Sequence, residues 1–205
     1  MPLLHYKQDD VDRLRLSIQT YGFGFLPDLV MPSALVRLRN EARELSGTAV
    51  FAKQSAKVSY QARIAPLGPE GRELLFGDQM IDLLFLVSGE RVLPSEDRSC
   101  LTVYHEGDHL GPHRDHPEAE CLVTAILYLA ASGSSQSSEK TGLVLQVYGQ
   151  EMTGDDRPRL SIPTTVGTIV IGRGSKFWHE RPMLEKGEAV VALTGCYGRL
   201  DEQSR

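Results

Sequence analysis

The segment "LTVYHEGDHLGPHRDH", residues 101–116, concentrates side chains that can bind a metal ion. Four of the six histidines of the chain lie in it. Residues two apart in an extended strand point to the same side, so His113 and Asp115 of its "HRD" end can share one space. An imidazole and a carboxylate placed in this way can bind one cation. A solvated polar loop is the alternative explanation of the same segment.

A third metal ligand has to come from another part of the chain. His179 in "SKFWHERP" is the last histidine and lies in a late segment of strand-like composition. Two histidines and one carboxylate form the facial triad of non-haem Fe(II) oxygenases, which leaves positions open for O₂ and an organic co-ligand. We expect His105, His109 and His116 to face solvent or to support the ligands without binding the ion.

Residues 1–95 carry mainly helical patterns. The segments "DDVDRLRLSIQTYG" and "MPSALVRLRNEARELSG" each place apolar residues at helical spacing and end at a glycine. The segment "PEGRELLFGDQMIDLLFLVSGERVLP" predicts one or two further helices, and "FGFLPDLV" predicts a short extended piece. This half of the chain therefore predicts a helical layer that packs against another element.

Residues 96–200 change to short segments rich in Val, Ile, Leu, Thr and Tyr, separated by Gly, Pro, Ser and Asp. These segments are "SCLTVYHE", "CLVTAILYLA", "GLVLQVYG", "RLSIPT", "GTIVIGR", "FWHERPM" and "EAVVALTGCYG". Their composition and spacing predict a β-sandwich or barrel, and "ASGSSQSSEKTG" predicts a polar surface loop. We expect one domain over residues 1–205, of the α+β, mainly β class, with a jelly-roll core and an N-terminal helical layer.

The composition of the 205-residue chain, 41% hydrophobic and 24% charged, is typical of a soluble globular protein. Its net charge of -5 provides no basic field that would favour nucleic acid or an anionic membrane. No apolar run reaches the roughly 18 residues of a membrane span. The beginning of the chain lacks the apolar core of a secretion signal, so we expect a cytoplasmic protein. Cys100, Cys121 and Cys196 are widely spaced, which predicts reduced, buried thiols.

Four segments together resemble the Fe(II)/2-oxoglutarate-dependent dioxygenase superfamily, in particular its prolyl-hydroxylase-like branch. They are "YHEGDHLGPHRDH", "CLVTAILYLA", "TGLVLQVYG" and "VGTIVIGRGSKFWHERPMLEKGEAVVALTGCYG", and the N-terminal "YGFGFLPDLVMPSALVRLRNEARELS" is similar as well. The resemblance covers most of the chain. It implies a double-stranded β-helix (a jelly-roll, cupin-like core) and Fe(II) held by His113, Asp115 and His179.

The resemblance also implies roles for two tyrosines and exposes one departure from the family pattern. Tyr104 matches a position that faces the cofactor, and Tyr128 matches one that can hydrogen-bond the far carboxylate of 2-oxoglutarate. The branch normally places an Arg or Lys on the last strand, where it pairs with that carboxylate. The matching positions here are Ala189 or Val190, which cannot neutralise a carboxylate.

Four other cations could replace the expected one. Arg181 lies two residues beyond His179, so on a regular strand it points into the same space. Arg199 lies past the end of the last strand, while Lys176 and Arg173 flank the turn before His179.

The resemblance implies an oxygenase that uses Fe(II), 2-oxoglutarate and O₂ to hydroxylate a C–H bond of a small-molecule or amino-acid-like substrate. Tyr60 and Arg63 are candidates for contacts to that substrate. One alternative is a 2-oxoglutarate-independent iron oxygenase, in which the substrate chelates the metal and Arg181 grips its carboxylate. The other is a jelly-roll protein that binds a small molecule or metal without catalysis. The sequence indicates no particular oligomeric state.

Overall fold

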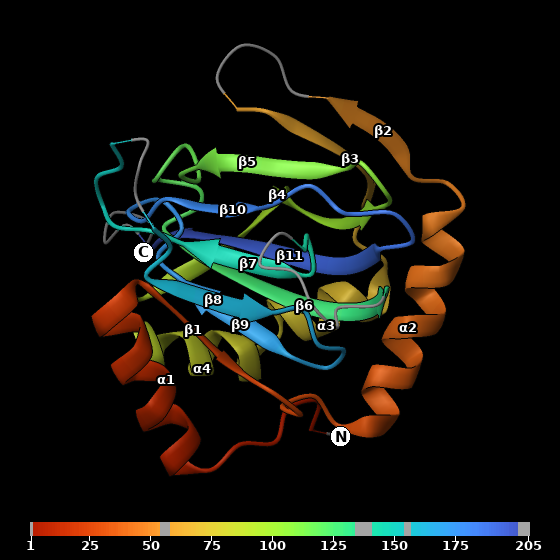
Figure 1. Ribbon diagram of the computed structural model, residues 1–205. Helices are drawn as coiled ribbons and strands as arrows, with labels where there is room; N and C mark the ends of the chain where they lie inside the picture. Colours follow the sequence, from red (N-terminus) through yellow and green to blue (C-terminus); the bar gives the residue numbers. More distant parts are fainter. Residues whose placement is uncertain (1, 54–57, 134–140, 154–156, 201–205) are drawn as a thin grey trace.

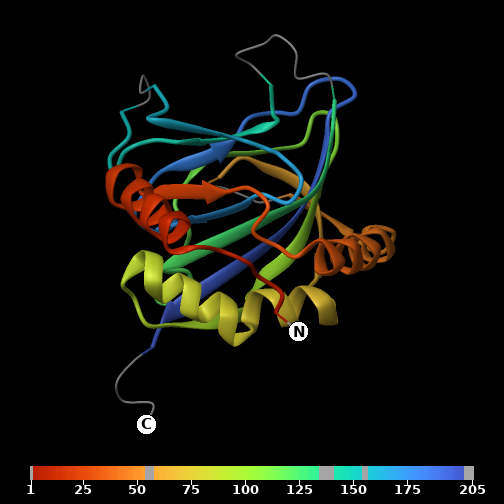
Figure 2. The same cartoon turned by 90° about the horizontal axis from the view of Figure 1, so that it is seen from below.

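The computed structural model describes residues 2–53, 58–133, 141–153 and 157–200. Its helices are α1 (Gln8–Tyr21), α2 (Pro32–Ser46), α3 (Pro69–Phe76) and α4 (Asp78–Ser88). Figure 1 shows them outside a curved body of strands, and Figure 2 shows them gathered along one side of it. The predicted N-terminal helical layer is therefore confirmed.

The strands form one 11-stranded sheet in the described part of the chain. They are β1 (Phe23–Leu26), β2 (Val50–Lys53), β3 (Tyr60–Pro66), β4 (Val92–Tyr104), β5 (His109–His113), β6 (Val123–Ser132), β7 (Val144–Val147), β8 (Leu160–Pro163), β9 (Ile169–Gly172), β10 (His179–Arg181) and β11 (Ala189–Arg199). The order in the sheet is β1-β9-β6-β11-β4-β3-β5-β10-β7-β8, and β2 pairs with the outer side of β3. All of the pairs are antiparallel.

Glycine and proline residues mark the ends of the helices. α1 ends at Gly22, which adopts the left-handed conformation (φ 84°) and donates its N–H to the carbonyl of Ile18. α2 has Pro32 in its first turn, where the absent N–H costs no helical hydrogen bond. The long third segment forms two helices because the chain becomes extended at Gly77.

Two apolar cores lie on opposite faces of the central strands. In β6, Val123, Ala125 and Leu127 face the core shared with the helices, whereas Tyr128 faces an inner core. Strands β6, β9 and β11 contribute to that inner core together with β7 and β8. The sheet thus folds over on itself, which is the double-stranded β-helix that the sequence predicts.

The N-terminal half contributes more to the sheet than its helical pattern indicates. β1 pairs with β9 at one end of the strand order, and β3 lies between β4 and β5. The segment of β3, "YQARIAP", alternates apolar and polar residues over positions 60–64, a strand signal that the predictions above did not use.

The prediction of three reduced cysteines is wrong for two of them. Cys121 and Cys196 form a disulfide, and Cys100 is free. Cys196 lies on β11 opposite Thr124 of β6, so the pairing of these strands brings the two cysteine Cα atoms within 4.7 Å. Their sequence separation of 75 hides this proximity in the sequence.

No helix among the described residues is long and apolar enough to cross a membrane. Most of the predicted polar loop "ASGSSQSSEKTG" lies outside the described residues.

Candidate metal centre

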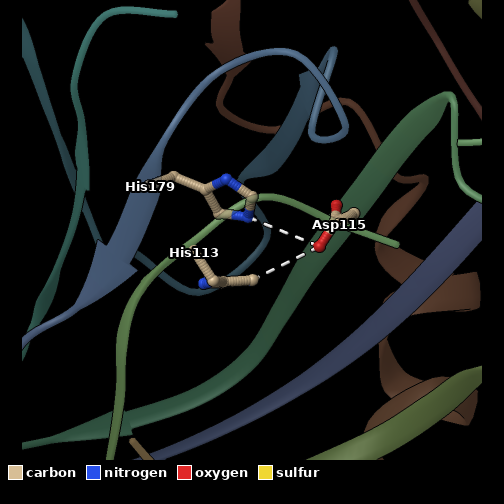
Figure 3. Close-up of side chains that lie close together, drawn as sticks. All are labelled: His113, Asp115 and His179. Atoms are coloured by element: carbon tan, nitrogen blue, oxygen red, sulfur yellow. Dashed lines mark ion pairs between the residues drawn. The ribbon is translucent and has the colours of Figure 1, made fainter. Parts of the chain in front are cut away.

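Two neighbouring strands bring His113, Asp115 and His179 together. β5 ends at His113, Asp115 follows two residues later, and β10 begins with His179. The two strands are antiparallel with His179 directly opposite His113. One potential ligand atom from each of the three side chains lies within 4.8 Å of the other two. Figure 3 shows the three side chains pointing toward one another.

Hydrogen bonds orient both imidazole rings for metal binding. The Nδ1 atom of His113 lies 3.0 Å from the carbonyl oxygen of Gly111, and that of His179 lies 3.0 Å from the carbonyl oxygen of Phe177. A carbonyl oxygen can only accept, so each Nδ1 carries the proton and donates it. Each Nε2 atom therefore presents a lone pair, at 3.3 Å (His113) and 3.7 Å (His179) from Oδ1 of Asp115.

Asp115 is held in its ionised form. Burial alone would raise the pKa of its carboxyl group, but His179, His113 and the Thr124 hydroxyl together hold that pKa well below its usual range. The Thr124 hydroxyl donates a hydrogen bond to Oδ2, and Oδ1 is left to face the histidines. The backbone also fits closely here, because a Cβ atom at Gly174 would overlap Oδ2 of Asp115.

His179 is held in its neutral form. Burial and the neighbouring His113 together lower its pKa to about 4, against the opposing effects of Asp115 and of the hydrogen bond to the Phe177 carbonyl. The ring of His179 packs between those of Phe23 and His113, with centroid separations of 4.9 and 4.2 Å. A neutral imidazole and an ionised carboxylate are the protonation states that a divalent metal requires, so this donor set fits Fe(II).

Arg181 lies at the other end of β10 and is buried. Its Nη1 atom donates to the carbonyl of Gly142 (2.7 Å) and to the Thr164 hydroxyl (2.9 Å), and its Nη2 atom donates to the Tyr128 hydroxyl (3.0 Å). The guanidinium also lies over the rings of Tyr104 and Tyr128, at 5.4 and 5.3 Å from their centroids. Three of the residues that the sequence associates with the co-substrate therefore form one cluster.

Val190 belongs to the inner core that contains Tyr104 and Tyr128. It lies directly opposite Tyr104 on β4. The apolar residue at this position of β11 is thus accompanied by a cation that reaches the same core from β10.

A cavity of about 580 Å³ opens beside the triad. Residues that line it include His113 and Asp115, both Tyr60 and Tyr104, and all three cysteines. Tyr60, one of the two candidates for a substrate contact, therefore lines this cavity, whereas Arg63 does not. Burial raises the pKa of Tyr60 far above its usual range, so this hydroxyl stays protonated.

The remaining candidate cations have other partners. Arg199 is exposed at the end of β11, opposite Val92, and its Nη2 atom lies 3.6 Å from Glu90. Lys176 lies 3.9 Å from Glu118. Arg173 donates to the carbonyl of Ser88 (3.0 Å), and Arg63 is paired with Asp108 at 3.5 Å. The structure does not bring these four residues to the triad.

The other histidines of the first motif diverge from the triad. His105 is exposed, and His109 contacts the Ser59 hydroxyl at 2.6 Å. His116 is exposed at the rim of the cavity. The exposure of His105 and His116 agrees with the expectation that these histidines face solvent or support the ligands, whereas His109 contacts Ser59 instead.

Sequence reasoning missed Thr124 as a partner of Asp115. Thr124 and Tyr128 lie four residues apart on β6, so their side chains point to the same, inner face of the sheet. The irregularity in the pairing of β6 with β11 lies beyond Tyr128 and does not change this. One contacts the candidate ligand Asp115 and the other contacts Arg181. The parity of Thr124 with Tyr128 was the available signal.

Neither a protein-family model nor a curated protein matches the chain, but solved structures do. A prolyl-4-hydroxylase from Pseudomonas putida superposes with a TM-score of 0.67 at 16% identity, covering 93% of this chain and 100% of that one. A 2OG-Fe(II) oxygenase-family oxidoreductase from Burkholderia pseudomallei gives 0.71 at 13% identity, with coverages of 98% and 97%. The epimerase SnoN, in complex with Fe3+, alpha ketoglutarate and nogalamycin RO, gives 0.69 at 13%, with coverages of 94% and 85%. The chain therefore has the fold of the 2-oxoglutarate/Fe(II) oxygenases, and the resemblance inferred from its motifs is confirmed at the level of the fold.

Proposed function

We propose that this protein is a non-haem Fe(II), 2-oxoglutarate-dependent dioxygenase that oxidises a C–H bond of a small-molecule or amino-acid-like substrate. The observation that carries the proposal is the convergence of His113, Asp115 and His179 within 4.8 Å, in the fold that oxygenases of this kind share. The similar structure of SnoN, which is a complex with Fe3+ and alpha ketoglutarate, supports the same pair of cofactors.

In this proposal one set of residues binds the metal and another binds the co-substrate. His113 and His179 would bind Fe(II) through Nε2, and Asp115 would bind it through Oδ1. Bound Fe(II), together with 2-oxoglutarate and O₂, supplies the oxidising chemistry for hydroxylation, with succinate and CO₂ as co-products. Arg181 and Tyr128 would anchor the far carboxylate of 2-oxoglutarate through charge-assisted hydrogen bonds, in preference to the exposed Arg199.

The buried surroundings support this assignment of the co-substrate site. Arg181 is only 4% exposed, so a carboxylate that meets its guanidinium does so with little competition from water. Tyr104 contacts that guanidinium and also lines the cavity beside the triad. It would therefore form the wall between the co-substrate and the space for the substrate.

We also propose a cytoplasmic location, on the basis of the composition of the chain. The Cys121–Cys196 disulfide counts against it, because disulfides persist mainly in oxidising compartments.

An anaerobic titration with Fe(II) and then 2-oxoglutarate tests the function. We expect a visible charge-transfer band that requires both components, and O₂ admission should then yield succinate. The band should be lost in His113→Ala and kept in His105→Ala, which removes an exposed histidine outside the triad.

Two results would contradict the leading proposal. A band that forms only with a substrate and without 2-oxoglutarate would favour the oxygenase in which the substrate chelates iron. Full succinate formation by His113→Ala in iron-supplemented buffer would rule out the triad as the catalytic centre.

A further inference from the structure

Arg114 lies at the edge of the candidate metal centre and has no charged partner among the described residues. It lies between His113 and Asp115 in the chain and lines the cavity beside them. Its Nε atom is buried and has no hydrogen-bond partner. No ion pair or hydrogen bond joins its guanidinium to another residue in the described part of the chain. A buried donor without a partner is costly.

Trp178 holds the guanidinium of Arg114 in place. The centre of the guanidinium lies 5.3 Å from the centroid of the Trp178 ring, within the range of a cation–π contact. Trp178 directly precedes His179, so this contact ties Arg114 to the strand that carries the distal histidine. Stacking on an aromatic face leaves the planar edge of an arginine free to bind a carboxylate with two parallel hydrogen bonds.

The charges around the cavity leave the positive charge of Arg114 unbalanced. Arg98, the other arginine that lines it, is paired with Glu120 at 2.5 Å. The inference rests on the proposed function, in which the two charges of Fe(II) and that of Arg181 balance Asp115 and the two carboxylates of 2-oxoglutarate. One positive charge then remains for the substrate.

We propose that Arg114 binds a carboxylate of the substrate, and that the substrate is a small monocarboxylic acid with an apolar body. The single unbalanced charge favours a carboxylate over a doubly charged phosphate. The cavity volume of about 580 Å³ suits a small molecule. Val58, Tyr60 and Leu110 line the same cavity and offer contacts for the apolar body.

Binding of matched acids and amides tests the inference. The protein is loaded with Zn(II) and N-oxalylglycine, which occupy the metal and co-substrate sites without turnover. N-acetyl-leucine, N-acetylphenylalanine and N-acetylproline are then compared with their primary amides by calorimetry. Trp178 is the one tryptophan of the chain, so its fluorescence reports on binding next to Arg114.

We expect at least one acid to bind about tenfold or more tightly than its amide and to change the Trp178 emission. Arg114→Gln should abolish this preference. Arg91→Gln is the matched control, because Arg91 also lies over an aromatic ring, that of Phe85 at 5.8 Å, but does not line the cavity. The control should keep the preference.

Three outcomes overturn the inference: no acid binds more tightly than its amide, the preference survives Arg114→Gln, or this variant loses N-oxalylglycine binding. The third would assign Arg114 to the co-substrate and leave the proposed function standing. Failure of Zn(II) and N-oxalylglycine to bind to the unchanged protein would instead contradict the proposed function. In that case the acid–amide comparison is repeated on the metal-free protein, and it shows whether Arg114 binds a carboxylate even though the proposed function is wrong.

Discussion

Arg181 donates a hydrogen bond of 3.0 Å to the hydroxyl of Tyr128, 53 residues earlier in the chain. This bond joins β10 to β6 across the inner core, to which Val190 also belongs. Val190 is one of the two positions at which the family pattern would place an arginine or lysine. The guanidinium reaches the core from a different strand, so a co-substrate carboxylate site is compatible with an apolar last strand.

Replacing Arg181 should weaken co-substrate binding. Arg181→Gln removes the charge that a carboxylate would pair with, so we expect at least about a tenfold loss of affinity for N-oxalylglycine. Calorimetry on the Zn(II)-loaded protein measures it, with circular dichroism to confirm folding of this buried variant. Arg199→Gln is the control and should bind normally, since Arg199 is exposed and paired with Glu90. Equal losses in both variants would contradict the assignment.

Thr124 should tune the metal site through Asp115. Thr124→Val removes the hydroxyl that donates to Oδ2 of Asp115, and we expect metal affinity to fall by about 10- to 100-fold. The pKa of Asp115 should rise, so metal release on acidification should begin at a higher pH. Thr124→Ser keeps the donor and should restore both properties. An unchanged pH profile in Thr124→Val would show that the bond does not position the carboxylate.

The triad histidines should be required for metal binding. His179→Ala removes one of three proposed ligands, so the purified protein should lose nearly all of its iron when measured by metal analysis. His109→Ala removes a histidine that contacts Ser59, outside the triad, and should retain it. Equal iron content in the two variants would refute the ligand assignment.

The metal-free protein should lose stability in mild acid. The pKa of His179 is about 4 in the folded chain, against its ordinary value of 6.5. Between these values the unfolded chain binds a proton that the folded chain does not, so stability falls as the pH drops. The loss for this group approaches about 3 kcal/mol by pH 4. Urea unfolding in EDTA measures it, and His179→Gln should flatten the slope over this interval.

Counting thiols will decide the state of the cysteines. Under non-reducing, denaturing conditions we expect one reactive thiol, that of Cys100, and three after reduction. Reduction should also lower the free energy of unfolding by about 2–4 kcal/mol, because the Cys121–Cys196 link closes a long loop. Three thiols in protein purified from the cytoplasm would restore the prediction of reduced cysteines.

Local patterns were sufficient for much of the fold. Apolar spacing and terminal glycines predicted the helices, and β-branched runs predicted the strands of the core, because both signals depend on neighbouring residues. β3 was not predicted, although residues 60–64 alternate between apolar and polar, because so short an alternation is a weak signal within a mostly polar segment. The same-side spacing of His113 and Asp115 pointed to a shared site for the same local reason.

By itself the sequence determined the chemical types of the candidate ligands, the alternation of strands and turns, and the absence of a cation at Ala189 and Val190. Only the tertiary structure decided which distant groups meet. Strand register placed His179 opposite His113, and the pairing of β6 with β11 joined Cys121 to Cys196. The folding of the sheet brought Arg181 to Tyr128. Such contacts depend on register and closure of the whole sheet, which local spacing does not specify.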